Sequence, residues 1–82
     1  MKQIINHILY DTDESVFVTY YYNLGCKREL YKTKTGKFFV VILDYWDKRT
    51  SIEAKDESFV KEALGKINID KYIELFGEPE EA

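Results

Sequence analysis

Apolar residues in the first half of the chain fall in short runs that are bounded by turn residues, which is the pattern of β-strands. Residues 16–22 are almost entirely β-branched or aromatic, and residues 28–33 and 38–45 lie on either side of a Gly-containing turn. Residues of these types pack well on a pleated surface. We therefore predict strands over 16–22, 28–33 and 38–45, and we expect Gly36 to adopt the left-handed conformation of a short hairpin loop.

The N-terminal segment allows two interpretations. Its isoleucine and leucine residues fit one face of a helix, but residues 3–10 also form an Ile-rich strand that ends at Tyr10. We favour the strand, because Asp11, Thr12 and Asp13 are typical of a turn and a helix this short is marginal in water.

The apolar period becomes that of a helix after a charged loop at 44–50 and a short edge strand at 51–53. Asp56 is a suitable N-cap for a first helix and Asp70 for a second. Gly77 predicts the end of the second helix. The apolar positions of the two helices are Phe59, Val60, Ala63, Leu64, Ile67, Ile69, Tyr72, Ile73 and Phe76.

Together these elements predict an α+β fold: an antiparallel β-meander of four strands, or five with the edge strand, and two short C-terminal helices packed on one face. We expect one domain over residues 1–77 and an acidic flexible tail over 78–82. Residues 38–43 are apolar at every position, so both faces of this strand need cover. Two helices cover only one face of a small sheet. The N-terminal segment closes the other face, or that face is a contact surface for a partner or a second copy of the chain.

Composition indicates a cytoplasmic protein that does not enter a membrane. Cys26 is the only cysteine, so no intrachain disulfide can form, which fits a reducing compartment. The N-terminus lacks the long apolar stretch of a signal peptide. The longest apolar run, residues 38–43, is far too short to span a bilayer.

No group of residues has the spacing of a catalytic or metal site. His7 is the only histidine, and one His with one Cys falls short of the usual zinc ligand set. Residues 11–14 begin like a calcium loop, but Phe17 lies near the position where such a loop requires glycine. Asp44 and Asp47 lack a third group for acid–base work. We therefore predict no enzyme, no metal and no cofactor.

A basic hairpin is one candidate binding surface. Residues 27–37 hold five basic residues and one acidic residue, although the whole chain has a net charge of −3. Such a ribbon can follow phosphates, and a tyrosine can stack on bases. Lysines on a hairpin also protect a sheet edge, and an acidic chain is unusual for a nucleic-acid binder. The residues concerned are Tyr31, Lys32, Lys34 and Lys37.

Aromatic residues are the other candidate. Tyrosine and tryptophan dominate the energetics of protein interfaces. Residues 20–22 are three successive tyrosines, of which Tyr20 and Tyr22 share one face of the strand. Tyr45 and Trp46 lie in the charged loop beyond a strand end, where a ring is hard to bury. We expect Trp46 to be the strongest binding anchor; the alternative is that its ring caps the core.

Several short motifs resemble those of a group of small uncharacterised proteins of gut Firmicutes and their phages and mobile elements. The motifs are Tyr10-Asp11-Thr12, the hairpin Glu29-Leu30-Tyr31-Lys32 through Phe38-Phe39, and Tyr72 with Leu75-Phe76-Gly77-Glu78. The resemblance covers nearly the whole chain. Relatives tend to have a Gly-rich stretch where this chain has residues 44–50. The resemblance implies bacterial or phage cytoplasm and an accessory role, and it provides no reaction and no binding residues to carry over.

The sequence thus predicts a non-enzymatic protein-binding module, with inhibition of a host or defence protein as one role. Residues 53–82 carry nine acidic and four basic residues, which could compete for a basic groove. The alternative is a small nucleic-acid-binding regulator that uses the basic hairpin 27–37.

Overall fold

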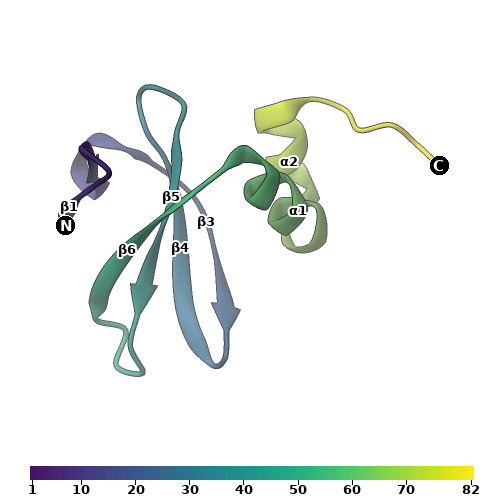
Figure 1. Ribbon diagram of the computed structural model, residues 1–82. Helices are drawn as coiled ribbons and strands as arrows, with labels where there is room; N and C mark the ends of the chain where they lie inside the picture. Colours follow the sequence, from purple (N-terminus) through teal and green to yellow (C-terminus); the bar gives the residue numbers. More distant parts are fainter.

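The computed structural model describes residues 1–82 and has the predicted α+β architecture (Figure 1). A four-stranded antiparallel sheet with strand order β3-β4-β5-β6 is joined by a separate two-stranded sheet, β1-β2, and by two C-terminal helices. The elements are β1 (Lys2–Ile5), β2 (Ile8–Asp11), a 3₁₀ turn η1 (Thr12–Glu14), β3 (Val16–Asn23), β4 (Cys26–Lys32), β5 (Phe38–Leu43), β6 (Arg49–Lys55), α1 (Glu57–Ile67) and α2 (Ile69–Phe76).

Tight hairpins join the strands of the main sheet. β3 and β4 are connected by Leu24 and Gly25 alone, and both residues have positive φ angles (54° and 80°). This is the conformation that matches the right-handed twist of the flanking strands in a two-residue hairpin. The next hairpin, residues 33–37, contains Gly36 at φ 85°, which confirms the left-handed conformation expected there.

The N-terminal segment is extended, as we favoured, but it is not one strand and it does not join the main sheet. A turn at Asn6 and His7 divides it into β1 and β2, and both turn residues have positive φ (51° and 65°). Asparagine tolerates this conformation better than most residues. The hairpin is closed where the backbone N–H of Thr12 donates to the carbonyl of Met1 at 2.9 Å.

β6 is longer than the expected edge strand over 51–53, and β5 is shorter than expected. β5 ends at Leu43 because Asp44 begins a turn, and β6 then pairs with β5 from Arg49 to Lys55. The polar composition of β6 concealed this strand in the sequence. Its Thr50 hydroxyl donates to the carbonyl of Ile42 at 2.9 Å and supports the pairing near the hairpin.

The core has two layers because β5 is apolar on both faces. Val40 lies on one face, in a cluster with Val60 and Leu64 of α1 and with side chains of α2. Phe39 and Val41 lie on the other face, where the cluster includes Tyr10 of β2 and where Ile5 and Ile8 also pack. The two helices therefore cover one face, as expected, and the N-terminal hairpin covers part of the opposite face.

The helix ends follow local capping rules. The side chain of Asp56 accepts from the N–H of Phe59 at 2.8 Å, as expected of the N-cap of α1. The expectation that Asp70 caps α2 is wrong. Asn68 does so, since its side chain accepts from the N–H of Lys71 at 3.1 Å, and this places Asp70 inside the first turn. α2 ends at Gly77, which has a φ of 86°.

Packing of α1 on the sheet can be tested with two truncations on the same helix. Leu64 is fully buried, whereas Ile67 is half-exposed. We expect Leu64→Ala to lower the free energy of unfolding by about 2–5 kcal/mol, because it removes buried apolar surface and leaves a cavity. Ile67→Ala serves as the control and should cost less than about 1 kcal/mol. Urea unfolding followed by circular dichroism measures both. Equal losses would contradict the placement of α1.

Candidate functional site

Tyr45 and Trp46 form the tip of the β5–β6 hairpin and are exposed, with 77% and 78% of their surfaces accessible. Asp44 holds this tip in one conformation. Its Oδ1 accepts from the N–H groups of Trp46 (2.9 Å) and Lys48 (3.0 Å), and its own N–H donates to the Lys48 carbonyl at 2.9 Å. The two rings are thus presented to solvent by a loop whose backbone is already ordered.

The tip of the β3–β4 hairpin lies beside this loop, at the bottom of the sheet in Figure 1. A Cβ atom on Gly25 would be 3.9 Å from the ring of Tyr45. The neighbouring Leu24 is 88% exposed. It also adopts a positive φ, a conformation in which Asn or Gly is more usual than Leu. We call the group of exposed apolar side chains at this end of the sheet the aromatic end. It consists of Tyr22, Leu24, Tyr45 and Trp46.

The sheet face that carries the N-terminal hairpin is open next to β3. Phe17, Tyr20 and Tyr22 are all exposed there. The rings of Tyr20 and Tyr22 meet edge to face with their centroids 6.2 Å apart, and the Lys27 ammonium lies 4.6 Å from the centre of the Tyr20 ring. Tyr22, next to the β3–β4 turn, belongs both to this open face and to the aromatic end.

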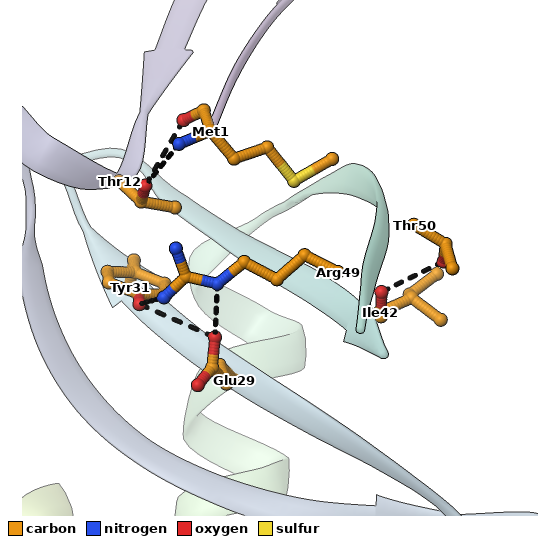
Figure 2. A network of polar contacts seen from close by, with 7 residues as sticks. All are labelled: Met1, Thr12, Glu29, Tyr31, Ile42, Arg49 and Thr50. Atoms are coloured by element: carbon orange, nitrogen blue, oxygen red, sulfur yellow. Dashed lines mark hydrogen bonds and ion pairs between the residues drawn. The ribbon is translucent and has the colours of Figure 1, made fainter. Parts of the chain in front are cut away.

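A polar network lies deeper on the same face (Figure 2). Arg49 donates from Nε to Glu29 Oε1 at 3.2 Å and from a terminal nitrogen to the Tyr31 hydroxyl at 2.9 Å. The Tyr31 hydroxyl also donates to Glu29 at 3.5 Å. The positive charge of Arg49 is matched by the negative charge of Glu29. The network therefore fixes β4 relative to β6 and leaves no unpaired charge.

Tyr31 does not lie on the surface, contrary to its expected place beside the basic turn. Its ring is buried and stacks on Phe39 with centroids 5.2 Å apart, while Phe17 meets it edge to face at 5.7 Å. β4 is an inner strand of the sheet, and its register places Tyr31 opposite Phe39. Only its hydroxyl reaches the polar network. The ring itself packs in the core and stabilises it.

The basic residues of the 27–37 hairpin do not form one surface. Lys27 lies on the open face, whereas Arg28 pairs with Glu53 on the helix-covered face at 3.7 Å. Lys32 also lies on that face, with its ammonium 6.0 Å from the centre of the Phe38 ring. Lys34 forms an ion pair with Glu14 at the opposite end of the sheet, and this contact raises the Lys34 pKa above its ordinary value. Lys37 follows in the same loop.

A groove near Lys37 is the largest hollow in the surface, at about 490 Å³. Only three of its eight lining residues are hydrophobic, and its charges balance, with Lys37 and Lys55 facing Asp56 and Glu57. Pockets that bind small molecules are mostly apolar with a few convergent polar groups. The groove is wide open and lacks that character.

Residues considered for catalysis lie apart from one another. His7 is in the β1–β2 turn, and Cys26 begins β4. Asp11 caps the 3₁₀ turn, and the Asp44 carboxylate is occupied by the N–H groups of its own loop. Nowhere does the structure gather three His, Cys, Asp or Glu side chains that could hold a metal. Neither helix has the length and apolar character to cross a membrane.

The sequence predicted the exposure of Tyr45 and Trp46 and the shared face of Tyr20 and Tyr22, but it did not single out the exposed Leu24. The sequence did carry a signal for the exposure of Leu24, because a leucine directly before a glycine in a two-residue turn lies away from the core. No protein-family model, curated protein or solved structure matches the chain.

Burial of Tyr31 predicts a loss of stability at high pH. Burial raises the pKa of the Tyr31 phenol above its ordinary value of 10.0, and the nearby Glu29 carboxylate adds to the rise. The folded state therefore holds this proton more tightly than the unfolded state does. The resulting stabilisation is complete below about pH 10 and is lost as the pH rises through the folded pKa.

We expect the free energy of unfolding to fall as the pH rises above about 10, and to fall less steeply in Tyr31→Phe. Urea unfolding at several pH values measures this slope. Tyr20→Phe, which removes the hydroxyl of an exposed tyrosine, controls for the substitution itself and should keep the wild-type stability at neutral pH. The same slope in Tyr31→Phe and wild type would show that this phenol is not the group responsible.

Proposed function

We propose that the protein is a non-enzymatic protein-binding module that docks onto a larger protein through its aromatic end and the adjoining open face. The observation that carries this proposal is the exposure of Tyr45 and Trp46 beside Leu24 on two neighbouring hairpin tips. Contiguous exposed apolar surface marks interaction sites in soluble proteins. Tryptophan and tyrosine supply the largest share of binding energy in such sites.

The backbone of the Tyr45-Trp46 loop favours tight docking. Asp44 already orders the loop through two hydrogen bonds to its side chain. Ordering a flexible loop on binding reduces affinity, so a loop that is ordered beforehand retains more of its contact energy. Asp47 and Lys48 follow the two rings in the same loop and can supply the polar rim typical of interfaces.

We also propose a cellular setting for this function, namely bacterial or phage cytoplasm. The resemblance to small proteins of bacteria and their mobile elements, together with the lone cysteine, supports an accessory role in bacterial or phage cytoplasm. Inhibition of a host or defence protein fits such a role. The acidic residues of 53–82 lie mainly on α1, α2 and the extended tail after Gly77, where they can face a basic partner.

Loss of Trp46 should weaken docking strongly without loss of the fold. The protein is immobilised, bacterial lysate is passed over it, and the retained protein is purified so that its dissociation constant can be measured by calorimetry. We expect Trp46→Ala to raise that constant at least about 30-fold, since anchor residues contribute about 2 kcal/mol or more. Trp46→Phe should recover part of the affinity, and thermal unfolding should stay at the wild-type temperature.

The double variant Lys34→Ala and Lys37→Ala is the matched control at the opposite end of the sheet, and we expect it to bind like wild type.

A salt titration separates protein docking from nucleic-acid binding, because contacts with several phosphates lose about 10³–10⁵-fold in affinity between 50 and 200 mM salt. Retention that is sensitive to nuclease, lost in the lysine variant and kept in Trp46→Ala would overturn the docking proposal in favour of nucleic-acid binding.

A further inference from the structure

Strand β3 is an unprotected edge of the main sheet. It is eight residues long, lies at the end of the strand order and contains neither a charged residue nor proline. Natural sheets protect their edges with charges, prolines or a covering segment. The other edge, β6, has such protection: it carries Arg49, Glu53 and Lys55, and Gln3 of β1 accepts a hydrogen bond from the N–H of Ile52 at 3.1 Å.

The outer side of β3 offers backbone groups that nothing in the chain pairs. In an antiparallel ladder that starts from a two-residue hairpin, the residues next to the loop exchange hydrogen bonds, and alternate residues point theirs outward. Counted from Asn23 opposite Cys26, the outward groups are those of Tyr22 and Tyr20. None of the backbone hydrogen bonds outside the helices and ladders involves β3, and the Tyr20 carbonyl receives only the Thr19 hydroxyl at 3.4 Å.

A β-bulge limits the length of this edge. The pairing of β3 with β4 shifts between Phe17 and Thr19, so Val18 interrupts the ladder. A bulge bends the strand and increases its twist, which turns the outer side away from a straight partner strand. The straight part of the edge is therefore residues 19–23, with Tyr21 at its centre.

We propose that β3 pairs antiparallel with β3 of a second copy of this chain, about a two-fold axis at Tyr21. In this register Tyr20 of each copy lies opposite Tyr22 of the partner subunit. The outward N–H and C=O groups of these residues can therefore pair with one another across the two strands. The strand carries no charge, so pairing with itself brings no like charges together. Aromatic residues directly opposite one another stabilise such a pair.

The two-fold axis stands perpendicular to the sheet, because paired antiparallel strands belong to one continuous sheet. Both open faces then lie on the same side, and both pairs of helices lie on the other. Tyr45 and Trp46 are on the β5–β6 hairpin, away from β3 in the strand order, so these two rings of the aromatic end stay free in each copy. The inference rests on the edge of β3: it shares Tyr20 and Tyr22 with the open face of the docking surface and does not involve Tyr45 or Trp46.

Sedimentation equilibrium tests the pairing with charge-swapped variants of two exposed residues. The wild-type mass should rise with concentration from 9.8 kDa toward twice that value. Tyr20→Lys with Tyr22→Lys places like charges opposite one another, and so does Tyr20→Glu with Tyr22→Glu, so each double variant should raise the dissociation constant about 10-fold or more. An equimolar mixture of the two should associate again. Trp46→Ala should dimerise like wild type.

A wild-type mass that stays at 9.8 kDa at every concentration, or a mixture that fails to associate, overturns the proposal. Amide hydrogen exchange distinguishes edge pairing from contact between sheet faces. The N–H groups of Tyr20 and Tyr22 should exchange more slowly as the dimer forms, since pairing engages them directly. Unchanged exchange of these two amides in a dimeric sample would show that the copies meet elsewhere. Folding of each variant is checked by circular dichroism.

Discussion

The two-sided burial of β5 is the constraint on which the rest of the structure depends. Phe39 and Val41 face one way and Val40 the other, and all three are completely buried. Each face of this strand must be removed from water, so the chain has to supply a layer on both sides of one small sheet. Two helices form one layer, and a hairpin of two four-residue strands forms the other. The smaller layer covers only part of its face, and the remainder stays open beside β3.

The elements that the sequence predicted are those with strong local signals. β3, both helices, the cap at Asp56 and the left-handed Gly36 follow from composition, period and turn chemistry within a few residues. The failures came where the local signal is weak or ambiguous, or where the decisive contact is distant. The sequence Asn6-His7 is a weak turn signal, and β6 is a strand because β5 offers it a ladder. Asn68 caps α2 in place of Asp70 because α1 extends to Ile67 and leaves no spacer.

In the candidate site, too, some features follow from local sequence signals and others depend on distant contacts. Exposure of Tyr45 and Trp46 could be predicted, because a loop beyond a strand end has no core beside it. The place of Tyr31 could not, because flanking charges made its strand look exposed, and only the register opposite Phe39 shows that the ring is inside. Charges that cluster in the sequence also separate in space. Lys27 and Arg28 are neighbours in the chain, yet alternation sends them to opposite faces of the sheet.

The two surfaces proposed for this protein share Tyr20 and Tyr22, but they can operate together because edge pairing leaves Tyr45 and Trp46 accessible. The docking anchors are side chains at one end of the sheet, while edge pairing uses the backbone along one side of it. Two copies joined antiparallel through β3 direct their aromatic ends in opposite directions along the strands. A partner with two equivalent sites at suitable spacing is then bound with an avidity beyond that of one contact. An edge without charges, which would otherwise favour aggregation, is thereby used in a closed two-fold contact that leaves no further edge of its kind exposed.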